Sequence, residues 1–185
     1  MTFKRIIRTL LIFAVLLAVI ALFLPDSFKV EKSMKIAAND SILYTQVADF
    51  ENWKNWEPWA PLDPEAKYTN TGEGLSAMRE WDGEINGKGS IELIELEAYK
   101  KVGTTLTFYD PNPMASYCYW TFDQSGDSTE VGIGCSGDLG FPFGRIFGLF
   151  VDFEEAMGPD FDKALNNLKD YAEPVQEMMT KNDTL

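Results

Sequence analysis

The sequence predicts one α+β domain, in which an antiparallel sheet of about six to seven strands packs against a long C-terminal helix. Several strand-like segments follow one another with only short turns between them, which is typical of an antiparallel meander. An amphipathic segment follows at about residues 144–171. Ahead of the sheet, Trp53, Trp56 and Trp59 lie within one short run and need a large apolar surface to pack against.

Residues 1–26 are predicted to form a membrane anchor. Lys4, Arg5 and Arg8 precede an uncharged and almost wholly apolar run, residues 9–24. As a helix this run spans roughly 24 Å, short of a hydrocarbon core of about 30 Å unless Arg8 snorkels. A cleavable signal peptide has the same basic start and apolar middle, but the small-residue cleavage pattern is poor, so we expect an uncleaved anchor.

This anchor predicts a single-pass protein of the cytoplasmic (inner) membrane. The basic flank should stay in the cytoplasm, which places the N-terminus inside and the domain on the outer side, periplasmic or extracellular. After residue 24 the chain carries thirteen basic and 29 acidic residues. Such an acidic domain repels polynucleotides and anionic lipid headgroups, so we expect no nucleic-acid partner.

The chain contains no histidine. This excludes Ser-His-Asp and Cys-His nucleophilic sites and every zinc site that uses a histidine ligand. The composition therefore weighs against an enzyme without excluding carboxylate, Tyr, Lys, Arg or Cys chemistry. We expect no catalytic residues, no metal and no cofactor.

Alternation of apolar side chains and turn residues places the individual elements. A helix is expected to start at Asn39 or Asp40 and to close at Asp49, and prolines then restrict the tryptophan run to a short helix and a loop. The C-terminal helix is expected to kink or to restart at Gly158-Pro159, with a polar tail at residues 174–185. The expected strands are residues 28–36, 75–82, 89–98, 101–109, 115–124 and 128–136.

This order of elements resembles the polyketide cyclase/START-like (SRPBCC) superfamily over residues 27–173, and in particular its bacterial membrane-anchored branch. The resemblance implies a helix-grip fold, in which the sheet wraps around the C-terminal helix and leaves a cavity between them. It does not specify a function, because the superfamily includes lipid carriers, hormone receptors and cyclases. The motif D-F-x-x-W-x-x-W-x-P-W carries the resemblance, here as Asp49, Phe50, Trp53, Trp56, Pro58 and Trp59.

Aromatic side chains are the candidates for lining such a cavity. They could form a wall for a hydrophobic ligand, or they could simply pack as core, which large aromatic clusters often do. The aromatic candidates are Trp56, Trp59, Trp81, Phe108, Trp120, Phe147 and Phe150.

Arg79 is the polar candidate for the cavity. It alternates in step with Ala77 and Trp81 and points inward if that face of the strand is concave; otherwise it is solvated outside. An inward guanidinium needs an anion, which could be a ligand carboxylate or a protein carboxylate such as Asp49 or Asp63.

Cys118 and Cys135 face each other if Gly126-Asp127 forms a two-residue turn. In that register Ser125 pairs with Ser128, and the two cysteines fall opposite one another at a non-hydrogen-bonded position. A disulfide is then possible in an exported domain, and two buried free thiols are the alternative.

A set of tyrosines and carboxylates could supply acid–base chemistry. It would combine Tyr109, Tyr117 and Tyr119 with Glu92 or Asp123, although nothing in their spacing requires it.

We expect a membrane-anchored, non-catalytic domain that binds a hydrophobic small molecule or lipid. One alternative is an envelope domain with a closed cavity that binds an unspecified protein partner. The other is an enzyme of the cyclase or dehydratase type, for which an inward Arg79 beside a tyrosine and a desolvated carboxylate would be the minimum support.

Overall fold

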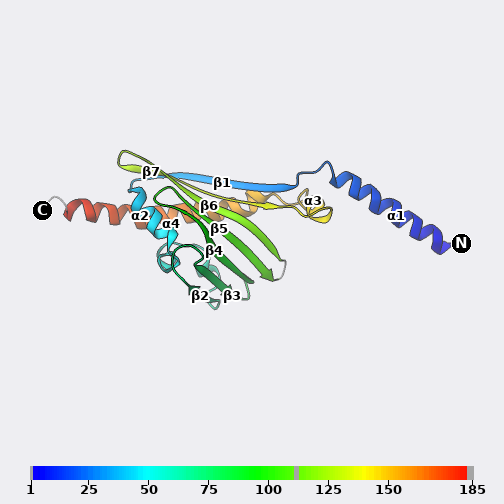
Figure 1. Cartoon of the computed structure of the whole chain (residues 1–185), viewed down its shortest axis with the longest axis horizontal. Helices are drawn as coiled ribbons and strands as arrows, with labels where there is room; N and C mark the ends of the chain where they lie inside the picture. Colours follow the sequence, from blue (N-terminus) through cyan, green and yellow to red (C-terminus); the bar gives the residue numbers. More distant parts are fainter. Residues whose placement is uncertain (1, 111–112, 183–185) are drawn as a thin grey trace.

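A single seven-stranded antiparallel sheet curves along one side of the long helix α4 (Phe153–Asn182) (Figure 1). The computed structural model describes residues 2–110 and 113–182. The strand order is β1-β7-β6-β5-β4-β3-β2, so every neighbouring pair except β1 and β7 is consecutive in the chain, as expected of a meander. The strands are β1 (Ser27–Ile36), β2 (Lys67–Thr71), β3 (Met78–Asp82), β4 (Lys88–Glu97), β5 (Lys101–Asp110), β6 (Met114–Ser125) and β7 (Ser128–Asp138).

The structure contains the six expected strands and adds a seventh, β2. Lys67–Thr71 forms the edge of the sheet and pairs only with β3, and none of its side chains is fully buried. An edge strand of this kind lacks the apolar alternation by which strands are detected. β3 begins at Met78, later than expected, and Leu75 lies exposed in the preceding turn.

Helix α2 (Asp40–Ala48) and the tryptophan run form one unit. The run folds into two short 3₁₀ helices, η1 (Phe50–Asn55) and η2 (Ala60–Leu62), followed by loop, as expected from its prolines. Side chains of η1 and the residue after it satisfy the carbonyls at the end of α2. Asn52 Nδ2 donates to Thr45 O (3.1 Å), Trp53 Nε1 to Val47 O (3.0 Å) and Trp56 Nε1 to Gln46 O (3.1 Å).

The C-terminal region differs from the sequence prediction. The segment after β7 forms a separate short helix, α3 (Phe143–Phe147), and α4 begins only at Phe153. α4 then runs as one helix through Pro159 and Pro174 to Asn182, so the helix does not restart at Pro159, and residues 174–182 of the predicted polar tail are helical. A proline inside a helix costs about 3 kcal/mol, which the burial of Phe161, Leu165 and Leu168 against the sheet offsets.

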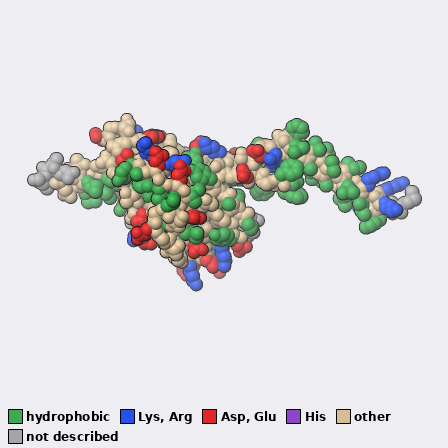
Figure 2. Space-filling view, viewed as in Figure 1, with side chains coloured by type: hydrophobic (Ala, Val, Ile, Leu, Met, Phe, Trp, Pro, Cys, Tyr) green, Lys and Arg blue, Asp and Glu red, His purple; other side chains and the backbone are tan. Residues whose placement is uncertain are grey.

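Helix α1 (Thr2–Ala21) extends away from the domain, and Figure 2 shows hydrophobic side chains along it. Within residues 2–110 and 113–182, no helix is both long and apolar enough to span a membrane, so the predicted transmembrane helix is not supported. The helix ends at Ala21 rather than Leu24, and Lys4, Arg5 and Arg8 occupy its first turns. Its uncharged part, residues 9–21, is only about 20 Å long at about 1.5 Å per residue.

The β6–β7 hairpin has the predicted register. Ser125 pairs with Ser128 across Gly126-Asp127, and Gly126 has a φ of 63°, which a glycine adopts without steric cost. Cys118 therefore lies opposite Cys135, and the structure joins them by a disulfide with a Cα–Cα distance of 4.0 Å. This bond joins β6 to β7, the second strand from the β1 edge of the sheet.

Leu168 tests how strongly α4 is held to the sheet. Its side chain is fully buried, so Leu168→Ala should lower the free energy of unfolding by about 3 kcal/mol. Leu75 is 61% exposed, and Leu75→Ala should change it by less than about 0.5 kcal/mol. Urea denaturation followed by tryptophan fluorescence measures both; equal losses would contradict this packing of α4.

Candidate ligand-binding cavity

A cavity of about 470 Å³ lies between the sheet and the N-terminal half of α4. Most of its wall is apolar, and it falls within the range of about 300–1,000 Å³ that is usual for small-molecule sites. The tryptophan run contributes one side, strands β3 to β7 contribute the back, and Met157, Asp160 and Phe161 of α4 close the front. Five of the predicted candidates line it: Trp59, Arg79, Trp81, Phe108 and Trp120.

The tryptophans divide between core and cavity. Trp56 does not line this cavity; its ring is 3% exposed and packs edge-on against Trp120, with a centroid distance of 5.3 Å. Trp53, which was not among the predicted cavity residues, does line it and lies 6.0 Å from the Trp59 ring. The indole N–H groups of Trp53 and Trp56 both donate to carbonyls of α2, so the difference lies in the ring of Trp56, which packs into the core against Trp120.

Phe147 and Phe150 were predicted to line the cavity and do not. They are 63% and 82% exposed and belong to the segment between β7 and α4. The prediction assumed one continuous helix from residue 144, which would have turned both rings toward the sheet. Since α4 begins at Phe153, the two rings have no sheet beneath them.

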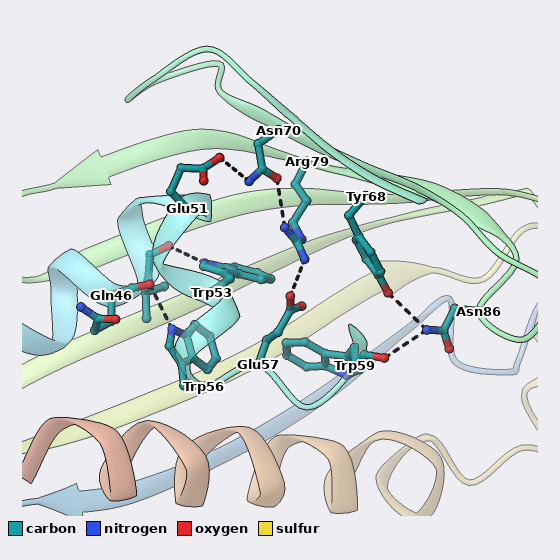
Figure 3. Close-up of polar contacts among 11 residues, drawn as sticks. Gln46, Glu51, Trp53, Trp56, Glu57, Trp59, Tyr68, Asn70, Arg79 and Asn86 are labelled. Carbon is teal, nitrogen blue, oxygen red and sulfur yellow. Dashed lines mark hydrogen bonds and ion pairs between the residues drawn. The ribbon is translucent and has the colours of Figure 1, made fainter. Parts of the chain in front are cut away.

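Arg79 points into the cavity and forms an ion pair with Glu57 (Figure 3). Its Nη2 donates to Glu57 Oε1 and its Nη1 donates to Asn70 Oδ1 at 3.0 Å. The guanidinium also lies over the Tyr68 ring, 4.5 Å from its centroid. Asn70 in turn donates to Glu51 at 2.7 Å, so the network joins the tryptophan run to β2 and β3.

Burial sets the electrostatics of this pair. Arg79 and Glu57 are only 7% and 8% exposed. Desolvation raises the pKa of Glu57, an effect that the charge of Arg79 partly opposes. Burial likewise raises the pKa of the Tyr68 hydroxyl. The cavity therefore contains a desolvated carboxylate, a guanidinium and a phenol side by side.

Glu57 was not predicted as the partner of Arg79. The two candidates named for that role are used elsewhere: Asp49 accepts from the backbone N–H of Glu51, and Asp63 accepts from the backbone N–H groups of Ile85 and Asn86. The sequence did indicate that Glu57 lies near the core, because it directly follows a tryptophan that had to be buried. Nothing in the sequence between residues 57 and 79 indicated that their side chains meet.

Asn86 and Gly89 position the aromatic rings near the cavity entrance. Asn86 Nδ2 donates to Trp59 O at 3.2 Å, and Asn86 O accepts from Trp81 Nε1 at 3.1 Å. Trp81 lies across Gly89, where an added Cβ would be 2.2 Å from the ring, and meets Phe108 edge-on at 5.6 Å. Gly89 is therefore needed for the ring to lie against the sheet.

The cavity opens at one end of the sheet. Its most exposed lining residues are Leu62, Ile85 and Met114, which lie in η2, in the β3–β4 turn and at the start of β6. In the antiparallel order this end also contains the start of β1, where α1 joins the domain. Ser116 Oγ lines the wall nearby and has no hydrogen-bond partner among the described residues.

The predicted acid–base set of tyrosines is not assembled. On β6, Ser116, Cys118 and Trp120 line the cavity, so Tyr117 and Tyr119 between them point to the opposite face. There Tyr117 donates to Glu95 at 2.7 Å and Tyr119 donates to Glu31, while Tyr109 pairs with Ser90 at 2.8 Å. These hydroxyls bind neither Glu92 nor Asp123 in the described part of the chain.

An antiparallel sheet curved around a long helix, with a cavity between the two, defines a helix-grip domain. The sequence model of the family described as "Polyketide cyclase / dehydrase and lipid transport" matches residues 27–173. The chain therefore belongs to this family, and the resemblance drawn from the tryptophan motif is confirmed.

Solved structures share the fold at low sequence identity. A Chromobacterium violaceum protein has 14% identity and a TM-score of 0.56, covering 81% of this chain and 99% of its own. The Aha1 dimer from Colwellia psychrerythraea has 16% identity and a TM-score of 0.58, covering 79% of this chain and 96% of its own. The di-domain ARO/CYC StfQ of steffimycin biosynthesis has 12% identity and a TM-score of 0.60; the match covers 80% of this chain and 51% of StfQ. Among curated proteins no match is found.

The ion pair of Arg79 and Glu57 should stabilise the fold only while both charges are present. Glu57→Gln leaves a buried guanidinium without its counter-charge and should cost about 3–5 kcal/mol, and Glu57→Gln combined with Arg79→Met should recover most of this loss. Denaturant unfolding of both variants measures the coupling. As a control, Asp82→Asn removes a half-exposed pair with Lys88 and should cost less than about 1 kcal/mol. Additive losses in the double variant would contradict the coupling.

Proposed function

We propose that the cavity binds a hydrophobic small molecule or lipid and holds it without catalysis. The observation that carries this proposal is an open cavity of about 470 Å³ whose wall is mainly apolar and in which Arg79, Glu57 and Tyr68 form one polar cluster. A few convergent polar groups in an apolar pocket are typical of ligand sites. A partner-binding domain with a closed interior is less well supported, because this interior is hollow.

The polar groups suggest how a ligand is oriented. The pair of Arg79 and Glu57 offers both a donor and an acceptor. Ser116 Oγ, on β6 and three strands away from Arg79, offers a separate hydroxyl without a partner among the described residues. An amphipathic ligand would place its polar group at the ion pair and its apolar part against Trp81 and Phe108. A pure hydrocarbon would leave these polar groups without partners, which costs binding energy.

The position of the cavity entrance suggests a membrane source for the ligand. It opens at the end of the sheet from which α1 leaves, and the apolar side chains of α1 are exposed. We propose that α1 together with residues 22–24 anchors the domain on the outer side of the cytoplasmic membrane. Because this uncharged stretch is shorter than the hydrocarbon core, the proposal requires Lys4, Arg5 and Arg8 to snorkel to the inner headgroups. A disulfide within the domain fits this oxidising side.

Native mass spectrometry of the full chain, extracted from a bacterial host in detergent, tests ligand binding. We expect a near-stoichiometric adduct whose mass, after organic extraction, identifies a lipid or another hydrophobe. An unliganded mass, together with no binding from a panel of fatty acids, phospholipids and polycyclic hydrophobes, would contradict the proposal.

A matched pair of tryptophan substitutions distinguishes the cavity from the surface. Leu106→Trp places a large ring in the cavity and should abolish the adduct, because the added volume occupies the site. Ile94→Trp adds the same ring at a position that is 43% exposed and does not line the cavity, and should leave the adduct unchanged. Circular dichroism checks that both variants are folded.

A cyclase or dehydratase activity is the second candidate, favoured by one observation. Arg79 lies inward beside Tyr68 and the desolvated Glu57, which is the arrangement expected above as the minimum support for such an enzyme. Glu57 would take a proton from the carbon next to a ketone, and Arg79 would stabilise the enolate oxygen. Conversion of a poly-β-ketone thioester mimic by the wild type but not by Glu57→Gln would support this candidate; no conversion by either would exclude it for this substrate class.

A further inference from the structure

The segment between β7 and α4, residues 139–151, exposes an unusual number of large apolar side chains. We call it the aromatic segment. Arg145 is its only charged residue, although the whole chain has a net charge of −13. Five of its side chains are between 52% and 82% exposed: Phe141, Phe143, Phe147, Leu149 and Phe150. Apolar groups that gather in this way on a surface mark an interaction site.

Specific contacts hold the aromatic segment against the end of α1. Arg145 Nη1 donates to Ala21 O at 3.4 Å, its Nη2 lies 3.9 Å from Asp26 Oδ2, and Leu139 N donates to Asp26 O at 2.7 Å. The next residues after α1, Leu22 and Phe23, are 63% and 85% exposed. Figure 1 shows α3 beside this junction, and Figure 2 shows hydrophobic side chains along α1 and around it.

We propose that the aromatic segment docks on the lipid bilayer that holds α1. The proposal rests on the membrane anchoring proposed above and adds a second point of contact. The apolar surface of the aromatic segment continues directly from that of α1. A bilayer that contains α1 therefore also contacts the aromatic segment, at the level of Leu22 and Phe23. Exposed Phe and Leu side chains insert to the boundary between headgroups and acyl chains.

The same contact determines where the cavity entrance faces. In the register of β6 and β7, Met114 at the cavity rim lies at the level at which the chain leaves β7 and enters the aromatic segment. With α1 and the aromatic segment both on the bilayer, the domain cannot rotate freely about α1. The entrance is therefore held toward the membrane, where a lipid could pass without crossing water.

Charge favours a zwitterionic rather than an anionic lipid surface. Asp138 and Asp152 flank the aromatic segment, and Arg145 is already close to Asp26. No uncompensated basic group within the segment is left to attract anionic headgroups. The apolar contact therefore has to supply the affinity, and phosphatidylcholine vesicles are the appropriate probe.

Depth-dependent quenching of an environment-sensitive label tests the docking on the full chain. Because Cys118 and Cys135 form a disulfide, a single introduced cysteine is the only thiol free to carry a nitrobenzoxadiazole label. The three positions are Phe150→Cys in the aromatic segment, Ala14→Cys in α1, and Leu75→Cys at the opposite end of the sheet. Each labelled chain is reconstituted into phosphatidylcholine vesicles with and without brominated phosphatidylcholine.

We expect a blue shift and quenching at positions 150 and 14, and neither at position 75. If the label at position 14 is quenched while the label at position 150 is not, as at position 75, the docking is overturned and the anchor remains supported. Quenching at position 150 alone would support the docking and contradict the anchor. The absence of quenching at both positions would overturn both proposals.

A double substitution within the aromatic segment checks that the apolar side chains cause the docking. Phe143 and Phe147 are exposed, so Phe143→Ser with Phe147→Ser should leave the fold intact. In this background the label at position 150 should lose most of its quenching, while the label at position 14 keeps its own. Unchanged quenching at position 150 would overturn the role of these side chains.

Discussion

The two hydrogen bonds from Trp53 and Trp56 to the end of α2 are the interaction on which the site depends. Val47 and Gln46 lie in the last turn of that helix, where backbone carbonyls have no partner within the helix. The indole N–H groups satisfy these carbonyls, and the rings cover them from water. Glu57 and Trp59 follow directly, so their positions are determined by this cap. Glu57 and Trp59 in the cavity wall are thus positioned by hydrogen bonds that lie outside the cavity.

The fold separates a packed end from a hollow end. Toward the C-terminus of α4, Leu165, Leu168 and Ala172 are fully buried against the sheet. Toward its N-terminus, Met157 and Phe161 line the cavity instead. Rigid packing at one end can therefore hold the walls of a cavity at the other without filling it. Because α1 leaves from the hollow end, the ligand site and the membrane contact we propose lie on the same side.

Binding and catalysis make different demands on the pair of Arg79 and Glu57. A binding site needs only a donor and an acceptor that remain in place, and the contacts with Asn70 and Tyr68 provide that rigidity. A general base needs a carboxylate that is free to take a proton, yet Glu57 Oε1 accepts from Arg79. The geometry therefore favours binding, and a reaction would require a substrate that displaces this hydrogen bond.

The sequence alone determined the family, the meander and the register of its last hairpin, because each depends on residues close together in the chain. Cys118 and Cys135 could be placed opposite each other by counting from a two-residue turn. β2 was not predicted, because an edge strand that buries neither face shows no alternation of apolar and polar residues. The extent of α4, through Pro159 and Pro174, could not be predicted, since packing against the sheet overrides local propensity.

The tertiary structure decided which of the candidate residues form the site, and it added Trp53 and Glu57 to them. The ion pair between Glu57 and Arg79 forms only when the tryptophan run folds against β2 and β3, and no local spacing in the sequence indicates it. It also decided that Trp56 packs behind the cavity wall and that Phe147 and Phe150 face outward. The direction of a side chain depends on which element covers it, and only the folded chain brings that element into place.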